Sequence, residues 1–157
     1  MKPINTRFDK LNYWQLSKFG SKFNLSFSSY EILSNKILGL DGIKRKLLVA
    51  EKNNELDCLY ILELSNLSAI TVKKIYNSIK VGDLKNRRIE EFLQFVLLQF
   101  EYGNEKEPIV LPFYESKINE IHDLPRLERK ARNWQILLSK MATTQIMDSL
   151  KKKNICT

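Results

Sequence analysis

Residues 123–141 read DLPRLERKARNWQILLSKM and contain the most regular pattern in the chain. Their apolar residues recur at spacings of three and four, the period of one face of an α-helix. These residues are Leu124, Leu127, Ala131, Trp134, Leu138 and Met141. Pro125 suits the first turn of a helix, and Asp123 suits its N-terminal cap. The pattern predicts a helix of roughly five turns with one buried face.

Upstream of this helix, residues 36–76 fall into short apolar runs separated by polar turns. The runs are residues 36–40, 46–51, 57–64 and 68–76. In the last of them, Ile70 and Val72 alternate with polar residues, as in a strand with one solvated face. The connections are short, which favours antiparallel pairing between neighbouring strands.

Residues 77–91 form a polar break, and the segment that follows it is ambiguous. Apolar spacing in residues 92–102 fits either a helix or a strand. We favour a strand from about 95 to 102, because residues 103–107 then form a hairpin turn before a return strand over 109–114. Pro112 places that return strand at a sheet edge or the strand's end.

These patterns predict an α+β fold in which a long C-terminal helix covers an antiparallel sheet or open barrel of about six to seven short strands. Residues 1–35 are rich in aromatic and basic residues and are expected to form an amphipathic N-terminal arm. Its helix would run from about 4 to 19 and end at Gly20. A single α+β domain over 36–142 and a basic tail over 143–157 complete the expected organisation.

Two resemblances accompany this pattern. The order of short strands followed by one long helix with a tryptophan midway resembles the pleckstrin-homology-like superfold over residues 36–142. That resemblance implies two orthogonal sheets with a C-terminal helix at one end. A second resemblance, to a family of uncharacterised bacterial proteins, rests on four blocks and implies a bacterial cytoplasmic setting with no assigned activity. The blocks are residues 70–79 (ITVKKIYNSI), 111–114 (LPFY), 124–128 (LPRLE) and 134–141 (WQILLSKM).

The residue inventory excludes several kinds of site. Two cysteines and one histidine are too few for a structural zinc site, which needs about four nitrogen or sulfur ligands. The cysteines also give no disulfide framework, which favours a reducing, cytoplasmic compartment. Charged residues interrupt the N-terminus before a signal-peptide core forms, and no apolar run approaches a membrane span. We therefore expect a cytoplasmic protein, with peripheral attachment at the inner face of the membrane as an alternative.

No recognisable catalytic or nucleotide-binding motif is present. The five glycines are scattered singly, so no phosphate-binding loop is formed. His122 stands beside Asp123 at the expected helix start, where a surface histidine is favoured over a general base. Acidic residues gather in 101–123, but most flank a hairpin turn and are expected to be solvated. We expect a protein that is not an enzyme and that uses no metal or cofactor.

The charge of the chain points to anionic partners. The formal net charge is +8, and residues 101–123 alone carry −4, which leaves +12 elsewhere. Polyanions are the natural partners of such a surface. The 19 lysines outnumber the 7 arginines, which favours non-specific attraction over base reading. The candidate anion- or partner-binding residues flank the polar break: Lys73, Lys74, Lys80, Lys85, Arg87 and Arg88.

The N-terminal arm offers a second candidate surface. Aromatic residues interleaved with basic ones are typical of an interfacial amphipathic helix. The candidate membrane-contact residues are Arg7, Lys10, Tyr13, Trp14, Lys18 and Phe19. The same aromatic side chains are also suited to packing onto the sheet, which we favour, or to binding a protein partner. The sequence leaves these three alternatives open.

Taken together, these observations favour a non-enzymatic cytoplasmic binding or scaffolding module. Its basic face would contact an acidic protein partner or an anionic membrane surface. The alternative is a non-specific nucleic-acid-binding protein that uses the same face, with Tyr76 beside Lys73 and Lys74 available for stacking on bases.

Overall fold

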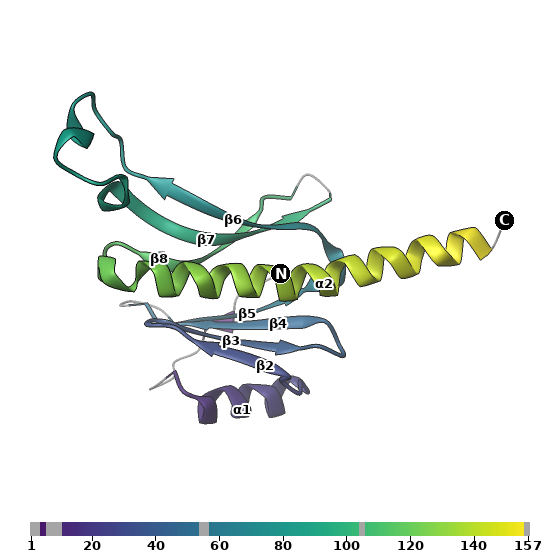
Figure 1. Cartoon of the computed structure of the whole chain (residues 1–157). Coiled ribbons are helices and arrows are strands. Elements are labelled where there is room, and N and C mark those ends of the chain that lie inside the picture. The colour runs from purple at the N-terminus through teal and green to yellow at the C-terminus, as the bar shows by residue number, and fades with distance from the viewer. Residues whose placement is uncertain (1–3, 6–10, 54–56, 104–105, 156–157) are drawn as a thin grey trace. The chain divides into compact units, whose positions relative to one another are not determined.

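A computed structural model describes residues 4–5, 11–53, 57–103 and 106–155 (Figure 1). The prediction of an α+β fold with antiparallel strands is confirmed. The strands are β1 (Ile4–Asn5), β2 (Ser29–Ile32), β3 (Lys36–Asp41), β4 (Lys46–Glu51), β5 (Cys58–Glu63), β6 (Leu67–Tyr76), β7 (Leu93–Tyr102) and β8 (Ile109–Glu115). The helices are α1 (Tyr13–Phe23) and α2 (Leu124–Ile155), with short 3-10 helices η1 (Leu64–Asn66), η2 (Asp83–Lys85), η3 (Ile89–Phe92) and η4 (Ile121–Asp123).

The chain divides into two compact units, residues 1–65 and 66–157. This division differs from the expected arm, domain and tail. Helix α1 does not stand apart as an arm, because its apolar face is buried in the core of the first unit. The expected tail is not a separate segment either, since α2 continues as a helix to Ile155.

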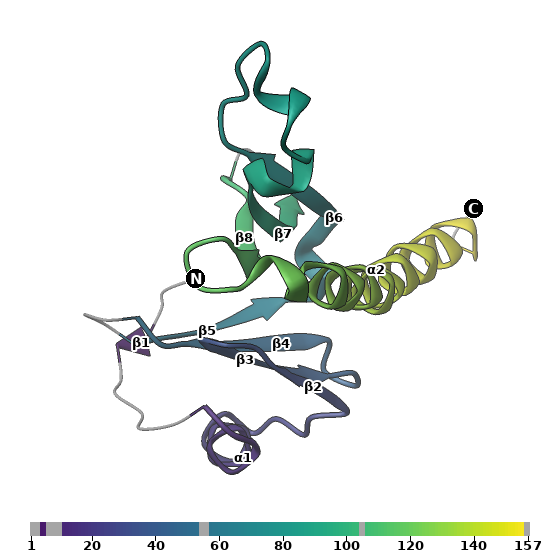
Figure 2. The ribbon, with the colours of Figure 1, turned by 60° about the vertical axis from the view of Figure 1, so that its left-hand side comes forward.

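The first unit contains an antiparallel sheet with the strand order β1-β5-β4-β3-β2. Helix α1 lies along one face of this sheet (Figure 2). The side chains of Leu16 and Phe19 are buried there with Ile37, Leu48 and Leu59 from the strands. Alternation along each strand brings these apolar residues to one face, so the helix and the sheet share one core.

Helix α1 begins and ends later than expected. The side chain of Asn12 caps its start by accepting a hydrogen bond from the Gln15 N–H at 2.9 Å. Its end is capped by Asn24 in the left-handed conformation, with φ 56°. Gly20, which we expected to end the helix, lies inside it. A Cβ atom there would stand 2.9 Å from the Leu25 carbonyl oxygen, so Gly20 permits close packing of the following loop.

The second unit contains a three-stranded antiparallel sheet, β6-β7-β8, and helix α2 packs against it. The stripe read from the sequence is buried at Leu124, Leu127, Ala131, Trp134 and Leu138, which confirms the predicted helix face. From the sheet, Val96, Leu98, Phe100 and Leu111 are fully buried. Pro112 lies in edge strand β8, as predicted, opposite a register shift between Val96 and Leu97.

The barrel implied by the pleckstrin-homology-like resemblance is not formed. The described strands make two separate sheets, and α2 packs along strands β6, β7 and β8 of its own unit. The sequence pattern located strands β3 to β8 but carries no information on how two sheets would close on one another. No helix within the described residues is both long and apolar enough to cross a lipid bilayer.

Candidate functional site

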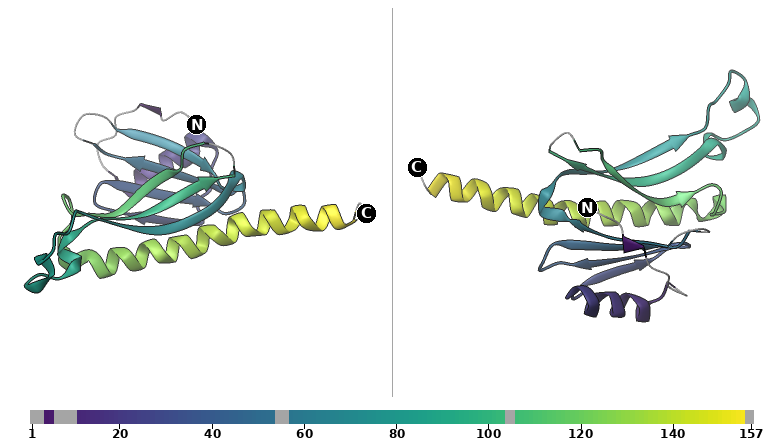
Figure 3. Two further views of the ribbon diagram at one scale, coloured as in Figure 1. Left: turned by 90° about the horizontal axis from the view of Figure 1, so that it is seen from above. Right: turned by 180° about the vertical axis from the view of Figure 1, so that it is seen from behind.

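The polar break of the sequence is a long loop that joins β6 to β7. It projects beyond the ends of both strands as the teal segment of Figure 1, and Figure 3 shows the same projection from two other sides. The loop closes where Tyr76 pairs with Leu93 across the two strands. Next to this pair, the Asn77 N–H donates a hydrogen bond of 2.8 Å to the Phe92 carbonyl. We call residues 77–92 the projecting loop.

The projecting loop is shaped by hydrogen bonds between its own residues. The Asp83 carboxylate accepts from the Lys80 N–H at 2.7 Å, which closes the turn before η2. Gly82, with φ 95°, supplies the left-handed conformation that this turn requires. The Glu91 carboxylate accepts from the Arg88 N–H at 3.1 Å at the start of η3. Two of the loop's three carboxylates therefore hold the backbone, whereas Glu90 is exposed.

Aliphatic side chains stand exposed along this loop. Val81 is fully exposed, and Leu84 is half exposed at 50%. Ile79 and Ile89 are exposed at 37% and 44%. Single exposed aliphatic residues are common on soluble proteins, but four within residues 79–89 form a cluster, which is typical of a contact surface. This cluster was not predicted from the sequence, because charged and polar residues outnumber the aliphatic ones in residues 77–91 and the segment was therefore interpreted as polar.

Two of the six predicted basic residues, Lys74 and Arg87, form ion pairs with carboxylates of the second unit. The Lys74 Nζ lies 2.8 Å from Glu128 Oε1 and thereby links β6 to α2. This ammonium, more than any other group, lowers the pKa of the Glu128 carboxyl against the opposing effect of burial. The Arg87 guanidinium lies over the Phe92 ring, 4.4 Å from its centroid, and pairs with Glu91 at 3.3 Å. Both cations already have partners inside the protein.

The other four basic residues face solvent. Within the part of the chain that the structure describes, their side chains form no ion pair. We call them the loop cations: Lys73, Lys80, Lys85 and Arg88. Lys73 lies on β6 at the base of the loop, and the other three lie within the projecting loop itself. The structure therefore brings all six predicted basic residues to one end of the β6-β7-β8 sheet. Two of them are paired with carboxylates of the second unit, and the four loop cations face solvent.

The candidate membrane-contact residues of the N-terminal segment differ in their exposure, and two of them are not described by the structure. Arg7 and Lys10 lie outside the described residues. Tyr13, Trp14 and Lys18 are exposed on α1, where Trp14 is 69% exposed. Phe19 is buried at 6% exposure, so the interpretation of Phe19 as a membrane contact is wrong. It lies one turn from Leu16 on the inner face of the helix, and the sheet covers that face.

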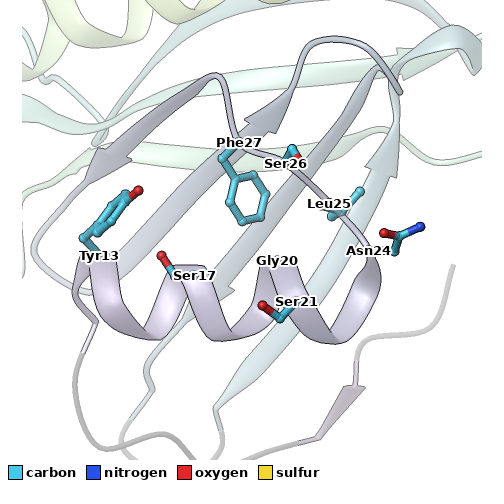
Figure 4. A pocket seen from close by; sticks show the side chains of 8 residues that line it. All are labelled: Tyr13, Ser17, Gly20, Ser21, Asn24, Leu25, Ser26 and Phe27. Atoms are coloured by element: carbon cyan, nitrogen blue, oxygen red, sulfur yellow. The ribbon is translucent and has the colours of Figure 1, made fainter.

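A polar cavity of about 330 Å³ lies beside α1 in the first unit (Figure 4). Its lining residues are Tyr13, Ser17, Gly20, Ser21, Asn24, Leu25, Ser26 and Phe27. Hydroxyl and amide groups dominate this lining, and no charged side chain contributes to it. The cavity therefore offers hydrogen bonds to a neutral group but no acid–base pair. Serines at positions 17 and 21, one helical turn apart, were the available sequence signal.

The titratable groups around the start of α2 are arranged as surface ion pairs. His122 is exposed, and its Nδ1 lies 3.0 Å from Glu120 Oε2. Its Nε2 lies 3.7 Å from Asp123 Oδ1, and Arg126 pairs with the same carboxylate at 3.5 Å. Among the described residues, no group of three or more potential metal ligands is found together.

No family model, curated protein or solved structure matches this chain. The projecting loop is the surface on which exposed aliphatic side chains, solvent-facing positive charge and a protruding shape coincide.

Proposed function

We propose that this chain is a non-enzymatic, cytoplasmic binding module that holds an anionic partner through its projecting loop. The observation that carries the proposal is that the loop cations remain exposed on a loop whose backbone is fixed by its own carboxylates. Loops fixed on a rigid scaffold commonly carry binding function.

The physical argument starts from the geometry of the cations. Each lysine or arginine near an anionic surface contributes about 1 kcal/mol, so four acting together can hold a protein at such a surface. Because internal hydrogen bonds shape the loop, binding orders little additional backbone, and less conformational entropy is lost. Lys74 and Arg87 are left out of this set, because each is engaged inside the second unit.

The test compares two charge-reversed variants of equal net charge. Lys85→Glu/Arg88→Glu changes the loop, and Lys117→Glu/Arg129→Glu changes exposed cations outside both candidate surfaces. The probes are vesicles of phosphatidylcholine with phosphatidylglycerol, a single-stranded RNA homopolymer and polyglutamate. We expect the loop variant to lower binding to at least one probe by about tenfold or more, with an unchanged melting temperature. Equal losses in both variants would show that net charge alone is at work and would overturn the proposal.

A second candidate function is non-specific binding of single-stranded nucleic acid. The observation that favours it is Tyr76, which is 38% exposed at the base of the projecting loop, on the same strand as Lys73. Aromatic rings of this kind stack on bases, and adjacent lysines neutralise phosphates. This function predicts a steep linear fall of log affinity with log salt for the RNA probe and a loss of RNA affinity in Tyr76→Ala.

A further inference from the structure

The aliphatic side chains of the projecting loop have no use in a purely electrostatic contact. We propose that the anionic partner is a lipid bilayer and that the tip of the loop, at Val81 and Leu84, inserts into its interfacial region. This inference rests on the proposed function, since it assumes that the projecting loop is the binding surface. It adds the class of partner and the part played by the uncharged residues.

The first step of the argument is the exposure of the tip. Val81 is fully exposed, and a Cβ atom placed on the adjacent Gly82 would meet nothing within 4 Å. Val81 therefore has no packing role that would explain its apolar character, and half of the Leu84 side chain is exposed. The turn that presents the tip is closed by the hydrogen bond from the Lys80 N–H to the Asp83 carboxylate.

The second step is the order of residues along the loop. Lys80 lies between Ile79 and Val81, and Lys85 follows Leu84 directly. An apolar tip that enters the bilayer interface thus carries ammonium groups to the level of the lipid phosphates. Lysine stems lie along apolar surface while their charged ends reach the polar layer, which makes this alternation compatible with insertion.

The third step separates a bilayer from the other anionic partners. The one aromatic residue of the projecting loop, Phe92, is buried, so the tip offers no exposed ring for the base stacking on which binding of single-stranded nucleic acid depends. An acidic peptide would satisfy the cations but would leave the aliphatic tip in water. A bilayer is the partner in which a layer of phosphates lies directly above an apolar layer, so that the cations and the aliphatic tip can be satisfied together.

The decisive experiment removes the apolar tip and keeps every charge. Val81→Ser/Leu84→Ser is compared with Val110→Ser/Ile136→Ser, a control that changes two exposed aliphatic residues outside the loop. Cosedimentation is measured with vesicles of equal parts phosphatidylcholine and phosphatidylglycerol at low and physiological salt. We expect the tip variant to lower vesicle partitioning by about tenfold at physiological salt, and the control to change it less than about twofold.

A second measurement reports insertion directly. Leu84→Trp is expected to show an emission shift to shorter wavelength and quenching by brominated lipid, after subtraction of the wild-type signal. Ile136→Trp, on α2, is expected to show neither effect. An unchanged spectrum for Leu84→Trp with the protein bound to vesicles would overturn insertion.

The outcomes separate the two proposals. If Lys85→Glu/Arg88→Glu weakens vesicle binding while Val81→Ser/Leu84→Ser does not, the binding module stands and insertion is wrong. If vesicles are not bound but the RNA homopolymer or polyglutamate is, the partner is not a bilayer. If neither loop variant differs from its control, both proposals fail. A loss in Trp14→Ala in place of the tip variant would move the membrane contact to α1 and overturn this assignment.

Discussion

Gly39 is closely packed in the core of the first unit. A Cβ atom there would stand 2.7 Å from one atom of the Phe27 ring and 2.9 Å from Leu16 Cδ1. Overpacking of this kind costs about 1 to 3 kcal/mol, so Gly39→Ala is expected to lower the free energy of unfolding by that amount. Urea unfolding of the full chain measures it. Gly103→Ala is the control, because among the described residues its Cβ meets Ser68 Cβ at 3.8 Å, an ordinary contact, and a loss of the same size there would contradict overpacking at Gly39.

Asp41 organises the turn between β3 and β4 through three backbone hydrogen bonds. Its carboxylate accepts from the Ser26 N–H at 2.9 Å, from the Ile43 N–H at 3.1 Å and from the Lys44 N–H at 2.9 Å. Asp41→Asn keeps the shape but replaces one acceptor oxygen with a donor. We expect a loss of about 1 to 3 kcal/mol in the free energy of unfolding at neutral pH. Unchanged urea unfolding would show that water or a rearranged turn satisfies these N–H groups.

Single side chains also mark the limit of sequence-based inference. Lys74 and Arg87 look identical to Lys73 and Arg88 in the sequence, since each pair is adjacent and equally charged. Strand alternation sends Lys74 and Lys73 to opposite faces of β6, and only one of them meets Glu128 on α2. That meeting depends on the packing of a segment more than fifty residues away, so no local pattern could reveal it.

Among the elements, α1 allows a direct test of whether the N-terminal aromatic segment packs onto the sheet or stands apart as an arm. Leu16 is fully buried on its inner face, and Trp14 is 69% exposed on its outer face. Leu16→Ala is expected to lower the free energy of unfolding by about 2 to 5 kcal/mol. Trp14→Ala is expected to change it by less than about 0.5 kcal/mol. Similar small effects in both variants would show that α1 is a loosely attached arm after all.

The periodic helix and strands were predictable because the apolar residues of the sequence pattern are the same residues that are buried in the structure. The helix stripe from Leu124 to Leu138 and the alternation in β6 follow directly from one buried face. Strand β2 was not predicted, since its four residues, SYEI, are half exposed and too few to establish a period. The end of α1 was misplaced for a different reason. Asn24 adopts the left-handed cap usually assigned to glycine, and Gly20 serves close packing instead.

Considered over the full chain, each unit has a carboxylate whose pKa is lowered. For Asp41, burial alone would raise the pKa, but hydrogen bonds from Lys44, Ser26 and Ile43 outweigh burial and lower it. For Glu128, the Lys74 hydrogen bond is the main cause of the lowered pKa. A lowered folded-state pKa contributes stability above the unfolded-state value, and this contribution is lost as the pH falls through the folded-state pKa.

Acid sensitivity is therefore expected below the ordinary carboxyl pKa values of 3.8 for Asp41 and 4.5 for Glu128. Urea unfolding measured from neutral pH downward is expected to show a smaller fall in stability for Glu128→Gln than for the wild type. Glu90→Gln, which changes an exposed carboxylate of the projecting loop, provides the control with an unaltered fall. A parallel fall in all three proteins would exclude Glu128 as a source of acid sensitivity.

The position of the candidate site in the sequence was predictable, but its exposed aliphatic side chains were not. Charge counting located the basic residues that border the break between β6 and β7, because lysine and arginine are conspicuous in any sequence. The exposed aliphatic tip was missed, since Val81 and Leu84 would be expected inside a core wherever a core is available. Their exposure follows from the turn closed by Asp83, and that turn became visible only in three dimensions.

The position of the loop at the end of a hairpin has a mechanical consequence. A pull on its tip acts along β6 and β7 in the same direction, so the ladder between these two strands is not sheared. The load passes instead to the ladder between β7 and β8, whose hydrogen bonds run perpendicular to the pull and resist sliding together. The Lys74–Glu128 ion pair and the hydrogen bond from Gln135 to the Ile70 carbonyl bear the remainder on the side of α2. A protein tethered by this loop would thus transmit tension into the β7–β8 ladder of its second unit.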